Sequence, residues 1–416
     1  MKVRFTPYMI SALTLPFTAM VSAQNSAPPP TAQPERIWHK ANFPDTESCQ
    51  AIVFDPQNPK RIVLGTRPGG LWESLDGGIS WSKMKTTMPS AVRYGFNPGS
   101  IVAHPRVKDL WFAGVEKNGA YRSRDGGRSW EQINAGLLEG NQLNGISFAF
   151  DAKEDARIFY GADGGLFTST DQGDHWAKCS RGLPSGRGGN TTVSRLATDP
   201  VTGALYAAFY AVGKGEQPGI YKSTDHGETW QVINNGIESG RDEVMLRGLQ
   251  ASSKKLTAAK TDSSLSVADW FDDKAWSFDV QMSPANPKVL FAAMYRVLYR
   301  TNDAGEHWQK CDKVTSPRSV AFHPKNPRTV VASGFKSIWI SHDGGESWRD
   351  ISAGLNDPPK AAKPPKIIDL GNGLKGQFAE NTDIFTPELL TFDPAGERLF
   401  ALTSQGLWIA TPSEQK

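Results

Sequence analysis

Six stretches of one eight-residue pattern decide the fold, beginning with SLDGGISW at residues 74–81 and SRDGGRSW at 123–130. The other four are STDQGDHW (169–176), STDHGETW (223–230), TNDAGEHW (301–308) and SHDGGESW (341–348). All six fit Ser/Thr-x-Asp-x-Gly-x-x-Trp, and each copy is called a box below. Repetition of this kind is the sequence signature of a repeat architecture.

The residues ahead of each box have a common order. In the first unit AIVFDPQNP (51–59) is followed by RIVLGT (61–66) and GGLWES (69–74), and then by the box. Short runs of β-branched and aromatic residues, bounded by Asp-Pro, Asn-Pro or Gly-Gly turns, are typical of strands. Four short strands per unit, repeated about every 40 to 50 residues, predict an all-β chain folded as a single β-propeller.

The number of blades follows from the first strand of each unit. These strands begin near Ile52, Ile101, Ile146, Val193, Met245, Val280, Val320 and Leu389, which predicts eight blades. The fifth unit has no true box, although Trp276 stands where its Trp is expected, and the count becomes seven if this segment is an insertion.

The two ends of the repeat region are predicted to form one blade together. The last unit stops before its fourth strand, and RIWHKA (36–41) can supply that strand with Trp38 in the box position. Joining the ends removes the free sheet edges that an open array would expose. We therefore expect a closed ring and one domain over residues 36–412.

The box suits the hairpin turn between the third and fourth strands of a blade. The Asp carboxylate can accept backbone N–H groups across the turn, and the Gly can take a positive φ. The Trp can pack as an apolar plug. We therefore assign a structural role, and no catalytic one, to the six box aspartates, which are Asp76, Asp125, Asp171, Asp225, Asp303 and Asp343.

These boxes resemble the Asp-box, or BNR, repeat of sialidases, sortilin-type receptors, photosystem assembly factors and xyloglucanases. The stretch AIVFDPQNPKRIVLGTRPGGLW (51–72) is most similar to the first blade of the xyloglucanase-type hydrolases. The resemblance implies a catalytic Asp just before the Gly-Gly pair, and here Arg67 and Pro68 stand there instead. In length the chain is most similar to the photosystem assembly factors. The motif implies a fold and leaves the function open.

Composition excludes several classes of function. The chain has 46 Lys and Arg against 43 Asp and Glu, a net charge of +3, which gives no electrostatic case for a nucleic-acid partner. Its three cysteines, Cys49, Cys179 and Cys311, are too far apart for a zinc motif. We expect no metal and no cofactor.

The N-terminus has the features of an export signal. Lys2 and Arg4 precede an apolar stretch that ends in Val21-Ser22-Ala23, and polar residues interrupt the stretch, so it does not fit a membrane span. We predict a signal peptide at 1–23, a Pro- and Ala-rich leader at 24–35, no membrane span after cleavage, and a secreted or periplasmic protein.

The propeller face opposite the boxes carries the candidate site, because there the turns between second and third strands align as a charged ring around the channel. Two carboxylates are the minimum for glycoside hydrolysis. Asp163, which precedes Gly-Gly in its blade, is the first catalytic candidate, with Glu116 or Asp242 as its partner. The candidate ligand-binding residues are Arg67, Tyr94, Arg296 and Lys336. A salt-bridged rim, with Asp163 paired to Arg67 or Lys117, is the structural alternative.

These observations favour a secreted monomer that binds a polysaccharide, an oligosaccharide or an envelope protein through the charged channel face. Two alternatives stay open at this point. One is a carboxylate-dependent glycoside hydrolase similar to xyloglucanases or sialidases, and the other is an assembly scaffold for an exported membrane complex. The long connections at 88–100 and 356–385 lie where such partners could be contacted.

Overall fold

A computed structural model gives the fold of residues 36–412, apart from the segments named at the end of this paragraph. The predicted signal peptide and leader lie outside the described residues. Within the described part, no helix has the length and apolar character needed to cross a bilayer. The segments left out are 44–47, 68–69, 89–95, 116–117, 138–144, 186–191, 212–216, 239–278, 295, 335, 356–365, 370–374, 379–386 and 404–405.

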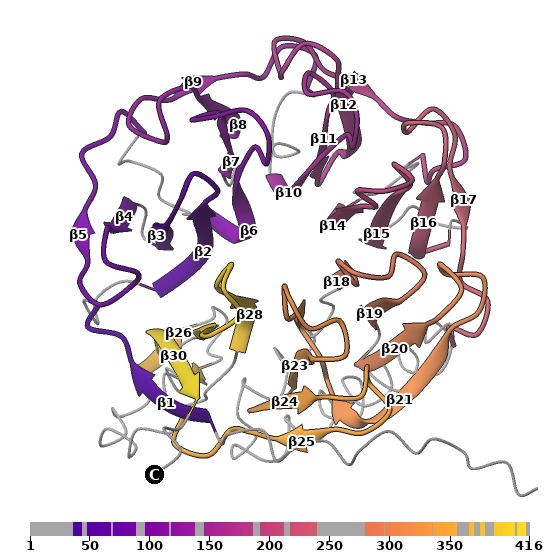
Figure 1. Ribbon diagram of the computed structural model, residues 1–416. Helices are drawn as coiled ribbons and strands as arrows, with labels where there is room; N and C mark the ends of the chain where they lie inside the picture. Colours follow the sequence, from indigo (N-terminus) through magenta and orange to yellow (C-terminus); the bar gives the residue numbers. More distant parts are fainter. Residues whose placement is uncertain are drawn as a thin grey trace, which may run out of the picture.

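The described chain is all β, and its strands form seven four-stranded antiparallel sheets arranged as a propeller (Figure 1). From the centre outward, blade 1 contains β2 (Ser48–Asp55), β3 (Asn58–Arg67), β4 (Gly70–Ser74) and β5 (Ser82–Lys83). Blade 2 contains β6 (Phe96–Ala103), β7 (Trp111–Val115), β8 (Gly119–Ser123) and β9 (Glu131–Gln132). Blade 3 contains β10 (Gly145–Phe150), β11 (Ile158–Ala162), β12 (Gly165–Ser169) and β13 (Ala177–Lys178). Blade 4 contains β14 (Thr192–Thr198), β15 (Leu205–Ala211), β16 (Gly219–Ser223) and β17 (Gln231–Val232).

The remaining blades follow the same plan. Blade 5 contains β18 (Asp279–Met282), β19 (Leu290–Met294), β20 (Val297–Thr301) and β21 (Gln309–Thr315). Blade 6 contains β22 (Val320–Phe322), β23 (Val330–Gly334), β24 (Ser337–Ser341) and β25 (Arg349–Asp350). Blade 7 contains β28 (Pro387–Phe392), β29 (Leu399–Thr403), β30 (Gly406–Pro412) and β1 (Arg36–Lys40). Between blades 6 and 7 a separate hairpin pairs β26 (Lys366–Asp369) with β27 (Lys375–Phe378).

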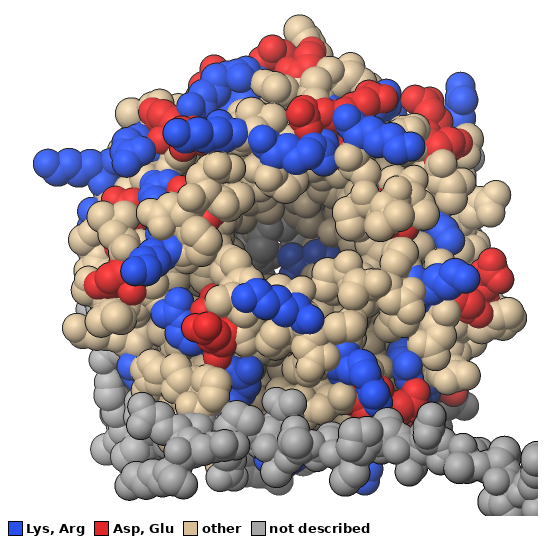
Figure 2. Space-filling model, viewed as in Figure 1, with Lys and Arg blue, Asp and Glu red and all other residues tan. Residues whose placement is uncertain are grey.

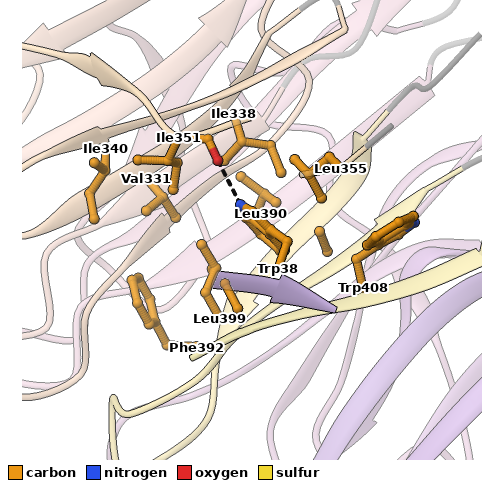
Figure 3. Close-up of a cluster of buried hydrophobic side chains, with 12 residues drawn as sticks. Trp38, Val331, Ile338, Ile340, Ile351, Leu355, Leu390, Phe392, Leu399 and Trp408 are labelled. Carbon is orange, nitrogen blue, oxygen red and sulfur yellow. Dashed lines mark hydrogen bonds between the residues drawn. The ribbon is translucent and has the colours of Figure 1, made fainter. Parts of the chain in front are cut away.

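Blade 7 closes the ring as the sequence predicts. Strand β1 pairs antiparallel with β30, with Trp38 opposite Ala410. Trp38 is buried between blades 6 and 7, and its Nε1–H donates to the Ile351 carbonyl at 2.6 Å (Figure 3). The box residues Trp176 and Trp308 donate in the same way to Ile133 and Ile233 of the preceding blade. Closure by the N-terminal strand is therefore confirmed.

Of the two predicted blade counts, eight and seven, the described residues show seven. Blades 4 and 5 are direct neighbours, because Trp308 N–H donates to the Asn235 carbonyl at 2.8 Å and both blades share one buried cluster that includes Tyr206 and Leu290. Among the described residues no sheet lies between them. The predicted fifth unit, with Met245 and Trp276, falls outside the described residues.

The boxes form hydrogen-bonded turns of one geometry. In the third box, Ser169 Oγ donates to Asp171 Oδ1 at 2.7 Å and accepts the Gly173 N–H at 2.7 Å, while Asp171 Oδ1 accepts the His175 N–H at 2.9 Å. The corresponding Asp-to-backbone bond occurs in each of the other five boxes. Partial burial raises the pKa of Asp171, but these hydrogen bonds outweigh it and lower the pKa to about 2.

This geometry predicts a loss of stability in acid. The pKa values of Asp171, Asp225, Asp303 and Asp343 are about 2 in the folded protein, against an ordinary value of 3.8, so the unfolded chain binds more protons between pH 4 and 2. Stability is therefore full above pH 4 and is lost as the pH falls toward 2. Urea midpoints at pH 6, 4, 3 and 2.5 should decline over that window. In Asp171→Asn the decline should be smaller and the midpoint at pH 6 lower, and an equal slope in both proteins would contradict the assignment.

Candidate functional site

The candidate site lies on the channel face, defined here as the face where second strands turn into third strands and where each blade connects to the next. First strands surround the centre, and contacts run from β2 through β6, β10, β14, β18, β22 and β28 and back to β2. Figure 2 shows one face of the ring with an opening at its centre, and the charged side chains in this view lie mostly toward the outer edge. No single sign of charge dominates this view, as the nearly neutral composition predicts.

Three predicted site residues occupy the same turn in different blades. Asp163 is half-buried between β11 and β12, and its Oδ1 accepts a hydrogen bond from Thr192 Oγ1 of blade 4 at 3.1 Å. Arg296 and Lys336 are exposed and have positive φ values of 66° and 58° at the equivalent turns of blades 5 and 6. The backbone thus presents these two cations at the channel face in a matched conformation.

The side chains of the other predicted site residues lie outside the described part of the chain. Arg67 is the last residue of β3, where its backbone pairs with Ser48. Tyr94, Glu116 and Asp242 lie outside the described residues, as does Lys117. Both proposed carboxylate pairs, and the alternative salt bridges of Asp163, therefore stay predictions.

A buried ion pair that sequence reasoning missed joins blades 4 and 5 at the start of β18. Arg195 Nε donates to Asp279 Oδ1 at 2.9 Å, and only 2% of the Asp279 side chain is exposed. Asp279 Oδ2 accepts the Val320 N–H of blade 6 at 3.0 Å, and Oδ1 also accepts from Gln281 Nε2 at 3.0 Å. One carboxylate thus links three consecutive blades.

A second ion pair lies at the corresponding place between blades 6 and 7. Arg318 Nη1 donates to Glu388 Oε1 at 2.7 Å, with about a quarter to a third of each side chain exposed. Serines make similar connections, since Ser147 Oγ accepts the Leu196 N–H and Ser319 Oγ accepts the Leu390 N–H. The only signal in the sequence was a charged residue within a short first strand, as Arg195 is in TVSRLAT.

The histidines lie away from this face, which disfavours chemistry that depends on imidazole there. His104 and His323 are in the turns between first and second strands, on the box face, and His39 is in β1. The other four are in boxes: His175, His226, His307 and His342. Among described residues, the one trio of potential metal ligands is Asp303, Glu306 and His307. Asp303 Oδ2 in that trio is hydrogen-bonded to His307 Nδ1, as its counterpart is in the third box, so it fits the box turn.

Comparison with known proteins identifies the fold. No family model matches the chain. A xyloglucanase of Acetivibrio thermocellus is 31% identical over 71 residues, which are 17% of this chain and 8% of that enzyme. Among solved structures, YCF48 from Cyanidioschyzon merolae aligns with a TM-score of 0.56 and 16% identity over 91% of this chain and 100% of that one.

Two further structures extend the comparison. YCF48 bound to the D1 peptide aligns with a TM-score of 0.55 and 15% identity, over 91% of this chain and 97% of that one. The GH74 xyloglucanase from Xanthomonas campestris aligns with a TM-score of 0.52 and 17% identity, over 85% of this chain and 56% of that one. The chain has the propeller fold of these proteins. The predicted resemblance is confirmed at the level of the fold, and the chain spans less than a tenth of the curated xyloglucanase.

Proposed function

We propose that this protein is an exported binding propeller that recognises a glycan or an extended peptide through its channel face. The observation that carries the proposal is the state of the described acids there. Asp163, Asp279 and Glu388 all accept hydrogen bonds from side chains of their own or neighbouring blades. Acids engaged in this way stabilise a rigid rim. Arg296 and Lys336 are exposed on the same face, where a ligand can reach them.

The likeness to single-propeller structures supports this choice. This chain aligns with the whole of YCF48, a structure of which has been solved with a bound peptide. It aligns with 56% of the Xanthomonas xyloglucanase. The resemblance to xyloglucanase-type hydrolases implies a catalytic Asp before the Gly-Gly pair of the first blade, and Arg67 and Pro68 stand there instead. The local 31% identity to a xyloglucanase keeps glycans in the set of ligands to be tested.

The test combines binding and cleavage. The full chain from Gln24 would be titrated with xyloglucan, other plant and bacterial polysaccharides and a displayed library of extended peptides, and reducing ends would be measured in parallel. We expect saturable binding to one class with no release of reducing ends, unchanged in Asp163→Asn. Cleavage that Asp163→Asn abolishes would contradict the proposal and establish the hydrolase alternative. No binding to either class would also contradict it and would favour the scaffold alternative.

A further inference from the structure

A cavity of about 260 Å³ lies between blades 6 and 7 on the box face, away from the proposed channel-face site. Its wall includes Arg36 of β1, Thr329 and Ile340 of blade 6, and His342 and Arg349 at the two ends of the sixth box. Figure 3 shows Ile340 near one end of the apolar cluster that Trp38 completes, with Trp408 at the other end. The cavity lining thus combines a few apolar side chains, Ile340 among them, with the basic side chains of Arg36, His342 and Arg349.

The cavity lies where two features found at other blade junctions are absent: an arginine side chain from one blade and the box of the next. In blades 1 and 7 an arginine near the start of the second strand reaches the box of the next blade: Arg61 Nη2 donates to the Gly126 carbonyl at 2.7 Å, and Arg398 Nη1 donates to the Gly77 carbonyl. Blade 6 has the short Thr329 at this position. Blade 7 has no box there, since β30 and β1 meet as two separate strands.

The basic groups around the cavity are only partly offset by acids. Within the described residues neither Arg36 nor Arg349 forms an ion pair. Burial lowers the pKa of Arg36 and the charge of Asp393 raises it in part, but Asp393 itself accepts a hydrogen bond from Arg398 Nε at 2.9 Å. Arg36 is oriented by its Nη1 bond to the Glu397 carbonyl at 3.1 Å and by the Phe392 ring at 5.4 Å. Asp343, the nearest box acid, is engaged by Ser341 and by the Ser347 N–H. Glu397 also borders the cavity, and it is exposed to solvent.

Two histidines, His323 and His342, line the cavity, and they differ in which ring nitrogens can bind a ligand. His323 Nδ1 accepts the N–H groups of Lys325 and Asn326 at 3.1 and 2.9 Å, as Asp151 does in its turn, so this ring serves the turn. His342 Nδ1 contacts Thr329 Oγ1 at 3.1 Å, which leaves Nε2 available on the cavity side. Burial lowers the pKa of His342, and the positive charges of Arg349 and Arg36 lower it further. The electrostatic effect of these two arginines therefore reaches the imidazole ring.

We propose that this cavity is a binding site for a small oxyanion, a phosphate or a carboxylate group, held by the guanidinium groups of Arg349 and Arg36 and by the Nε2 atom of His342. Guanidinium groups bind carboxylate and phosphate oxygens in bidentate geometry. Ligand pockets for drug-sized molecules run from about 300 to 1,000 Å³. The smaller volume here therefore fits a single acidic group with a few further atoms and excludes a polymer.

Calorimetric titration at pH 7 with inorganic phosphate and with glucuronate, each against potassium chloride at matched ionic strength, tests the proposal. We expect saturable heat with at least one of the two anions; tighter phosphate binding identifies an inorganic anion, and tighter glucuronate binding identifies an organic acid. Arg349→Gln should weaken binding at least tenfold and Arg349→Lys less, because a lysine keeps the charge without the bidentate geometry. Neither anion binding beyond the chloride control, or full binding by Arg349→Gln, would overturn the proposal.

Two controls separate this site from the rest of the molecule. Arg128→Gln, at an exposed arginine in the box of blade 2, should bind the anion as the parent protein does. Arg296→Glu with Lys336→Glu, on the channel face, should also leave anion binding unchanged. Loss of anion binding in either control would contradict a site at blades 6 and 7, whereas failure of the glycan and peptide tests would not affect it.

Discussion

Trp38→Ala will lower the free energy of unfolding by about 3–5 kcal/mol, the usual cost of removing a large buried aromatic side chain. Trp38 is 6% exposed, packs among Leu355, Leu390 and Trp408, and donates the hydrogen bond to Ile351 (Figure 3). It is also the residue that fixes β1 on blade 6, so its loss acts on ring closure as well as on packing. Urea unfolding followed by circular dichroism measures the effect.

The matched control for this prediction is the neighbouring residue. Ile37 is 59% exposed in the same strand, so Ile37→Ala should change the free energy of unfolding by less than about 0.5 kcal/mol. Trp38→Phe should fall between the two variants, since it keeps much of the packing and loses the hydrogen bond. Equal midpoints for Trp38→Ala and Ile37→Ala would show that β1 does not stabilise the ring.

Asp279→Ala will have an effect of similar size, about 3–5 kcal/mol, because breaking a buried ion pair leaves an uncompensated charge. The substitution removes the partner of Arg195 and the acceptor of the Val320 N–H in one step. Three blades lose a connection at the channel face. Urea unfolding again gives the magnitude.

An exposed ion pair in the same protein serves as the control for Asp279. Arg106 and Asp155 also pair, with 39% and 50% of their side chains exposed. Exposed pairs contribute about 0–1 kcal/mol, so Asp155→Ala should be nearly neutral. A small effect of Asp279→Ala, no larger than that of Asp155→Ala, would mean that the buried carboxylate does not connect the blades.

The sequence predicted those parts of the fold that are set by a short, local motif. A box contains its own hydrogen-bond donors and acceptors within eight residues, so the turn, the propeller class and the place of Trp38 could all be inferred. The blade count could not be inferred in this way. The sequence from Met245 to Trp276 has the periodicity of strands, but a blade is defined by contacts with its neighbours, and periodicity does not encode those contacts. Contacts in three dimensions, such as that of Asn235 with Trp308, show that blades 4 and 5 are neighbours.

The candidate site was predicted only in part, because only some of its residues occupy positions that repeat from blade to blade. The turn positions of Asp163, Arg296 and Lys336 follow from aligning the repeats. The pairing of Arg195 with Asp279 joins residues 84 positions apart, and no spacing rule brings them together. The cavity between blades 6 and 7 arises from a short side chain at Thr329 and from the absence of a box in blade 7. No sequence motif marks a cavity that forms because side chains are missing.

The most direct test of the central claim is a binding titration that compares reversed charges on the two faces. Arg296→Glu with Lys336→Glu alters the channel face, and Lys325→Glu with Arg328→Glu alters the box face at residues that are equally exposed. With the glycan or peptide that the parent chain binds, we predict at least a tenfold loss of affinity for the channel-face variant and no change for the other. Equal affinities in the two variants, or a larger loss from the box-face changes, would contradict recognition through the channel face.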